Sequence, residues 1–257
     1  MHAPVAPPPI EPELLMLAYR SGVFPMADAH DDPQVFWVEP RRRAILPLDG
    51  LRVSRSLART LRRGRFEVTC NAAFDAVIAA CAEAASDRAE TWISGRIAAS
   101  YRALHRASAA HSIECWQGGE LVGGLYGVGF DRAFCGESMF SRVPDASKVA
   151  LAWLVAALRR GGATLLDCQF MTDHLASLGA VEISQKRYLA LLRAAQAGVG
   201  AAEGVAAGAG EAGGAALADG AGLGLPDGFA ALRGDAFATG LASSPGKLIA
   251  QFLTQTS

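Results

Sequence analysis

Residues 112–140 read SIECWQGGELVGGLYGVGFDRAFCGESMF, a stretch in which apolar residues alternate with small or polar ones. A period of two is that of a β-strand. Two breaks interrupt it, at 117–120 and at 129–132, and both place glycine beside polar residues, as hairpin turns do. The stretch therefore predicts three consecutive antiparallel strands, which form a β-meander.

The segments on either side of the meander change to helical spacing. Before it, an apolar stripe that includes Tyr101 follows Ser94, which is the expected helix cap. After it, a long apolar helix is expected to end at the glycines 161–162, and residues 164–170 form one more strand. Helix, meander, helix and strand together predict an α+β architecture with a mixed sheet.

Three polar side chains stand in strands that are otherwise apolar. Glu137 lies in the third strand of the meander, where burial of an unpaired carboxylate is costly. Asp167 and Gln169 are two residues apart in the following strand, so their side chains leave the same face. Side by side in one sheet, the three would bring a proton acceptor and amide donors to one cleft. In the alternative interpretation, Asp167 and Gln169 lie at a strand end and only cap backbone amides.

The chain has 257 residues and a net charge of −1, yet one segment is strongly basic. From Arg41 to Arg65 its charge is +8, with Asp49 the single acidic residue, which leaves −9 for the rest of the chain. The basic residues are all arginines: Arg41, Arg42, Arg43, Arg52, Arg55, Arg59, Arg62, Arg63 and Arg65. Guanidinium groups match phosphate geometry, so this face is a candidate for binding RNA. A charged face that is merely solvated is the alternative.

Two tryptophans, Trp37 and Trp92, precede loops or helix caps in the arginine-rich half of the chain. Beside a basic face, an indole ring can stack on an unpaired base, as in the recognition of single-stranded RNA. Packing in the core is the alternative for both residues.

Composition argues against several classes of protein. No apolar run is long enough to span a membrane, and the first residues lack the basic start and apolar core of a signal peptide. The five cysteines are odd in number and widely spaced, which predicts reduced thiols in the cytoplasm and no metal site. Balanced composition without heptads makes a monomer the expected state.

The composition also divides the chain into five segments. We expect a disordered lead at 1–10, a small N-terminal domain at 11–65 and a catalytic domain at 66–193. An Ala/Gly-rich flexible insertion follows at 194–228, because it lacks the large apolar groups that offset chain entropy. The last segment, 229–257, is expected to contain a short helix.

The sequence resembles the bacterial leucyl/phenylalanyl-tRNA–protein transferases. The matching blocks occur in the family's order from about residue 12 to residue 193: LAYRSGVFP (17–25), TWIS (91–94), HSIE (111–114), LVGGLYG (121–127), FCGESMFS (134–141), ASK (146–148), LDCQ (166–169) and DHLASLGA (173–180). The resemblance implies a small N-terminal domain followed by a domain of the acetyltransferase-like (GNAT) fold.

The resemblance also implies an activity and its site. Leucine or phenylalanine, and less readily methionine, would move from tRNA to the N-terminal Arg or Lys of a protein, which then enters the N-degron pathway. No cofactor is needed, because an aminoacyl ester is already activated. By position, Asp167, Gln169 and Glu137 match catalytic residues, with Asp167 orienting the amine or accepting its proton, directly or through Gln169. The amino-acid pocket matches Leu125, Phe134, Leu151, Leu154, Leu158 and Leu166. Trp37 and Trp92 match the positions that hold the terminal adenosine, and the arginine-rich face suits the tRNA backbone through Arg41, Arg42, Arg43, Arg55, Arg59, Arg62 and Arg63.

Two rival functions use the same observations. An acyl-CoA acetyltransferase needs a glycine-rich pyrophosphate loop where the strand meets the helix, but residues 141–145 lack one and Pro144 removes an amide donor. A non-catalytic RNA-binding module would use the arginines, but it would leave Glu137, Asp167 and Gln169 without a role.

Overall fold

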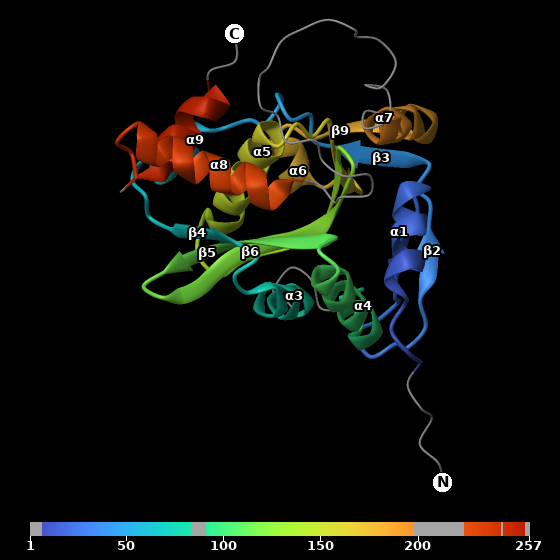
Figure 1. Ribbon diagram of the computed structural model, residues 1–257. Helices are drawn as coiled ribbons and strands as arrows, with labels where there is room; N and C mark the ends of the chain where they lie inside the picture. Colours follow the sequence, from blue (N-terminus) through green and yellow to red (C-terminus); the bar gives the residue numbers. More distant parts are fainter. Residues whose placement is uncertain (1–6, 84–90, 198–223, 243, 255–257) are drawn as a thin grey trace, which may run out of the picture.

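The computed structural model describes residues 7–83, 91–197, 224–242 and 244–254, and its centre is one mixed β-sheet (Figure 1). Neighbouring strands are antiparallel except for one parallel pair, β7 and β8. The predicted meander is confirmed as β5, β6 and β7, and the α+β class is confirmed. Across the sheet the strands are β4 (Glu67–Cys70), β5 (Ala110–Gln117), β6 (Glu120–Phe130), β7 (Ala133–Ser141), β8 (Leu165–Gln169), β3 (Arg42–Ile45) and β9 (Val181–Ser184).

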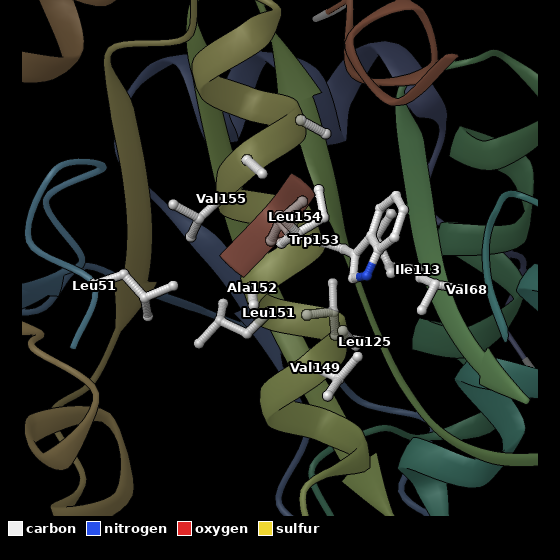
Figure 2. Packing of buried hydrophobic residues seen from close by; sticks show 14 of the residues in the cluster. Leu51, Val68, Ile113, Leu125, Val149, Leu151, Ala152, Trp153, Leu154 and Val155 are labelled. Carbon is white, nitrogen blue, oxygen red and sulfur yellow. The ribbon is translucent and has the colours of Figure 1, made fainter. Parts of the chain in front are cut away.

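One face of the sheet is covered by α5 (Ala146–Arg160), the helix that connects the parallel strands β7 and β8. Nearly all of α5 is buried, because α8 (Leu225–Ala238) and α9 (Pro245–Thr254) cover its other side. Figure 2 shows Leu151 and Leu154 of α5 in the hydrophobic core, with Leu125 of β6 beside them.

The sequence pattern did not predict α8, which begins within the predicted insertion 194–228. Its contact with α5 includes the rings of Trp153 and Phe229, whose centroids are 5.2 Å apart. A Cβ atom at Gly228 would lie 2.3 Å from the backbone oxygen of Ala157, so only glycine permits this close crossing. Most of the predicted insertion, residues 198–223, lies outside the described residues, and residues 194–197 end α7 (Gln185–Ala197).

The opposite face of the sheet carries α3 (Phe74–Ala82) and α4 (Gly95–Arg106), with α1 (Pro12–Arg20) beside α4. The predicted cap of α4 is confirmed, since the Ser94 hydroxyl accepts a hydrogen bond from the Ile97 amide. The sheet separates two hydrophobic cores, and the neighbouring residues Leu125 and Tyr126 of β6 face opposite sides, with Leu125 in one core and Tyr126 in the other.

The N-terminal part of the chain is tied into this architecture at several points. β1 (Phe24–Met26) and β2 (Phe36–Val38) form a separate two-stranded sheet, and α2 (Arg55–Arg62) and α6 (Asp173–Ser177) complete the described helices. β3 comes from the segment assigned to the small domain, yet it pairs with β8 and β9 in the main sheet. The predicted disordered lead lies mainly outside the described residues, and Ile10 at its end is buried, with its amide bonded to the Ser100 hydroxyl.

Candidate active site

Glu137 sits in a β-bulge of β7. Tyr126 of β6 pairs with Ser138 and Gly127 pairs with Gly136, so Glu137 is an extra residue without a partner in β6. A bulge redirects the side chain of the extra residue and is frequent beside active sites. Gly127 opposite the bulge has to be glycine, because a Cβ there would lie 2.3 Å from the Cys135 backbone oxygen.

The parallel strands β7 and β8 part beside this bulge. Their pairing ends with Cys135 opposite Asp167, and beyond it the Gln169 side chain reaches across to Glu137. The carboxamide Nε2 of Gln169 donates to Glu137 Oε1 at 2.8 Å. The backbone of Gln169 is left-handed, with φ of 63°, so it leaves the strand conformation at this point.

A cavity of about 270 Å³ opens between the parting strands and α5. Four residues of the predicted amino-acid pocket line it, namely Leu125, Leu151, Leu154 and Leu166, and Trp92 lies at it as well. The cavity is otherwise mainly apolar, through residues that sequence analysis did not assign to it, such as Met139, Cys168, Phe170 and Leu175. Glu137 and Gln169 supply polar groups to its wall, an arrangement typical of small-molecule sites.

Two predicted pocket residues lie elsewhere. Phe134 and Leu158 do not line the cavity, because both are fully buried in the hydrophobic core. Both are apolar residues in apolar elements, as the lining leucines are, so the sequence could not distinguish residues that line the cavity from residues buried in the core. Trp37 stands on β2 with 42% of its surface exposed, and it is not among the residues that line the cavity.

Glu137 is buried, and in the described part of the chain no salt bridge involves it. Its Oε1 accepts hydrogen bonds from Tyr19 and Gln169 at 2.8 Å each, and its Oε2 accepts one from Tyr101 at 2.9 Å. Tyr19 belongs to α1 and Tyr101 to α4, and their hydroxyls also contact each other. Burial raises the pKa of Glu137 to about 7, although the hydrogen bonds from Tyr19, Gln169 and Tyr101 act in the opposite direction.

Asp167 lies behind the cavity wall and is completely buried. Arg43 donates to it twice, from Nε to Oδ1 at 2.9 Å and from Nη2 to Oδ2 at 2.5 Å. Tyr188 donates to Oδ2 at 3.0 Å, and the Gln169 amide donates to Oδ1 at 2.8 Å. Asp167 therefore does cap a backbone amide, as the alternative interpretation expected, and it fixes Gln169 by doing so.

The prediction that Arg43 contacts the tRNA backbone is wrong. Its side chain is buried with Asp167, and the guanidinium lies over the rings of Phe24 and Tyr188, 4.8 and 4.3 Å from their centroids. Its Nη1 also donates to the backbone oxygen of Gly22 at 3.0 Å. Burial lowers the pKa of Arg43 and its pairing with Asp167 raises it, and the net direction is upward.

The other arginines of the predicted tRNA face are on the surface. Arg41 and Arg42 are exposed beside or on β3, and Arg42 pairs with Glu182. Four further arginines line a shallow depression along α2: Arg55, Arg59, Arg62 and Arg63.

Three tyrosines at the site were not predicted from the sequence, namely Tyr19, Tyr101 and Tyr188. Tyr19 falls within the LAYRSGVFP block, which was a signal that could have found it. The spacing of Tyr101 fits an apolar stripe on a helix and nothing more, and nothing in the sequence marks Tyr188. In the described part of the chain, no group of His, Cys, Asp or Glu side chains is arranged to hold a metal ion, and none of the described helices is long and apolar enough to cross a membrane.

An apolar cavity that ends at a buried carboxyl with a raised pKa is a common form of enzyme site. Fold and site together are those of an α+β enzyme with an apolar cavity beside a buried carboxyl group.

Comparison with known proteins identifies the family. The model described as leucyl/phenylalanyl-tRNA protein transferase matches residues 45–193, and the model of its N-terminal domain matches residues 9–41. The leucyl/phenylalanyl-tRNA–protein transferase of Novosphingobium aromaticivorans is 63% identical over 263 aligned positions, covering 98% of this chain and 99% of that protein. The proteins of the same name from Rhizorhabdus wittichii and Zymomonas mobilis are 61% and 56% identical, over 76% and 72% of this chain and 80% and 69% of their own. The chain therefore belongs to the leucyl/phenylalanyl-tRNA protein transferase family, as the resemblance predicted.

Proposed function

We propose that this protein transfers leucine or phenylalanine, and less readily methionine, from an aminoacyl-tRNA to the α-amino group of a protein that begins with Arg or Lys. Membership of the family supports the transfer. The observation that carries the proposal is the cavity, whose apolar wall ends at Glu137 and Gln169. An apolar side chain in this cavity would place its ester carbonyl beside the polar end, where the chemistry has to occur.

The cavity also supports a choice among amino acids. Leu125, Leu151, Leu154 and Leu166 form a wall without charges, which favours Leu, Phe and Met over polar side chains. Each missing or misplaced methylene in such a pocket changes the transition-state energy by about 1–3 kcal/mol. Trp92 lines the cavity, which supports the proposal that it holds the terminal adenosine, and Trp37 is the second stacking residue that the resemblance assigns.

The tRNA backbone is proposed to lie along the exposed arginines of α2, with Arg41 and Arg42 extending the face. One guanidinium group can donate two hydrogen bonds to the oxygens of one phosphate, and a row of arginines therefore suits the regularly spaced phosphates of RNA. The protein is proposed to act in the cytoplasm as a monomer, without a cofactor, and its products are proposed to enter the N-degron pathway.

Gln169 is proposed to hold the incoming amine. Its Nε2 is committed to Glu137 and its backbone amide to Asp167, so the carboxamide oxygen is the atom left to accept an N–H from the amine. Alignment of an amine with an activated ester contributes much of the rate of such a reaction.

The transfer is tested with tRNA charged with radiolabelled leucine and an acceptor protein that begins with Arg. We expect label in the acceptor, and none when the same protein begins with an acetylated residue. Gln169→Ala is expected to reduce the single-turnover rate by about 100-fold. Gln117→Ala, an exposed glutamine at the end of β5, is the matched control. A wild-type protein that leaves correctly charged tRNA untouched would overturn the proposed function.

A further inference from the structure

The two carboxylates of the site differ in how many acceptor positions remain open. A carboxylate offers about four lone-pair positions. On Asp167, Arg43 and the Gln169 amide occupy Oδ1, and Arg43 and Tyr188 occupy Oδ2. All its positions are taken and its side chain has no exposed surface, so Asp167 has no place for a further proton and no path to the cavity.

Glu137 has one position left. Tyr19 and Gln169 occupy its Oε1, but among the described residues only Tyr101 donates to Oε2. Glu137 also lines the cavity and keeps 9% of its surface exposed. A reacting amine in the cavity would therefore find an acceptor on Glu137.

The tyrosines around Glu137 give a second, independent indication. Three oxygen–oxygen contacts close a triangle: Tyr19 with Tyr101, Tyr19 with Oε1, and Tyr101 with Oε2. Each contact needs a hydrogen, and two neutral hydroxyls supply only two. A proton on Glu137 supplies the third, so the cluster is completed when it takes up one proton.

Building on the proposed function, we infer that Glu137 is the general base of the transfer and that Asp167 is a positioning residue that exchanges no proton. The neutral α-amine attacks the ester carbonyl carbon, and a C–N bond forms while Gln169 Oε1 holds one N–H. The second N–H proton passes to Glu137 Oε2. The C–O bond to the ribose then breaks, its electron pair leaves with the ribose oxygen, and that oxygen takes the proton from Glu137. The products are an amide and a free ribose hydroxyl, and Glu137 is again a carboxylate.

The electrostatics of the cluster agree with the role of Glu137 as the base and of Asp167 as a positioning residue. The pKa of Glu137 is about 7, close to the pH at which a general base works best. The ionisable groups that face it from the surrounding elements are Tyr19 of α1, Tyr101 of α4, Cys135 of β7 and Asp167 of β8, with Arg43 of β3 behind Asp167. His174 of α6 lines the same cavity, and because it is common to the wild type and Glu137→Gln, it does not account for a difference between their pH profiles. Burial raises the pKa of both tyrosines, so both hydroxyls keep their protons throughout the working range.

The pH dependence of single-turnover transfer to a peptide with N-terminal Arg tests the inference. In the wild type both the peptide amine, with a pKa of about 8, and Glu137 must lose a proton, so log rate against pH should have a slope of about two below pH ~6. Glu137→Gln is expected to lower the rate by about 100-fold or more and to reduce this slope to about one. Asp167→Asn is expected to lower the rate and to keep the slope of about two.

Either of two results would overturn the inference: Glu137→Gln keeping the steeper slope, or the slope changing in Asp167→Asn instead. Tyr101→Phe serves if Glu137→Gln does not fold by circular dichroism. Loss of a donor to the carboxylate should raise the pKa of Glu137 and so move the part of the pH profile that depends on it to higher pH, whereas a purely structural defect would lower the rate equally at every pH. An inactive wild type contradicts the proposed function, while an active wild type with an unaltered Glu137→Gln contradicts only this inference.

Discussion

Arg43 and the arginines of α2 come from the same basic segment of the sequence, but they occupy opposite environments. Arg43 is buried between two aromatic rings and paired with Asp167. Arg55, Arg59, Arg62 and Arg63 are exposed along a depression on the surface. The first arginine stabilises the frame behind the site, and the others are available to a polyanion.

The comparison shows that a high density of arginines in a sequence does not reveal which of them form buried ion pairs and which remain on the surface. Inside the protein, removal of one partner leaves the other buried and unpaired, which is costly. On the surface, water and salt screen the same change. Glu137 lies between these cases, because it is buried with hydrogen-bond donors but, among the described residues, has no cation beside it.

The largest effect is expected from Arg43→Ala. Asp167 would stay buried without its cation, so we expect a loss of about 3–5 kcal/mol in the free energy of unfolding. The matched control is Arg42→Ala, the preceding residue, whose side chain is 63% exposed and pairs with Glu182 on the surface. That variant should lose about 1 kcal/mol or less. Urea unfolding of both variants measures the difference, and equal losses would remove the distinction between buried and exposed arginines.

Glu137 should make stability depend on pH. Its pKa is raised from 4.5 to about 7, so the folded state holds this proton more tightly than the unfolded state. The contribution of the protonated Glu137 to the free energy of unfolding is therefore fully present below pH 4.5. It is lost as the pH rises toward 7, by an amount on the order of 3 kcal/mol. Burial lowers the pKa of His111 to about 4, which has the opposite effect, since stability then rises with pH between about 4 and 6.5.

The comparison of wild type with Glu137→Gln separates the two contributions, because His111 is common to both proteins. The difference in their free energies of unfolding should shift in favour of Glu137→Gln as the pH rises from 4.5 to 7. A difference that stays constant across this window would mean that Glu137 titrates as an ordinary surface carboxyl.

The sequence was sufficient for the parts of this molecule that depend on local pattern. Period two predicted the meander, helical spacing predicted α4 and α5, and polar side chains in apolar strands marked Glu137, Asp167 and Gln169 as residues that could lie close together. It was insufficient where a residue's role depends on a distant partner. Arg43 and Asp167 are 124 residues apart, and Tyr19 and Glu137 are 118 residues apart. Only the folded sheet brings these residues together.

Two further features were hidden for physical reasons. The bulge at Glu137 depends on how β7 pairs with β6, and no residue type in β7 predicts it from the sequence. α8 was not predicted because its first residues, up to Gly228, fall in the Ala/Gly-rich segment 194–228, although this glycine allows α8 to approach α5. Glycine has a low helix propensity, but here the absence of a side chain allows the two helices to pack closely.

The smallest expected effect concerns the exposed arginines. The double variant Arg62→Ala, Arg63→Ala should leave stability nearly unchanged and weaken binding of tRNA by roughly tenfold, since two phosphate contacts would be lost. The slope of log affinity against log salt should also become shallower by about 1.5–2. The matched control is Arg106→Ala, Arg193→Ala, which removes the same charge from exposed positions on α4 and α7. If both double variants weaken binding equally, net charge explains the effect and α2 is not the tRNA face. If only the α2 variant does so, the arginines of the basic segment divide by burial into a structural one and a binding group.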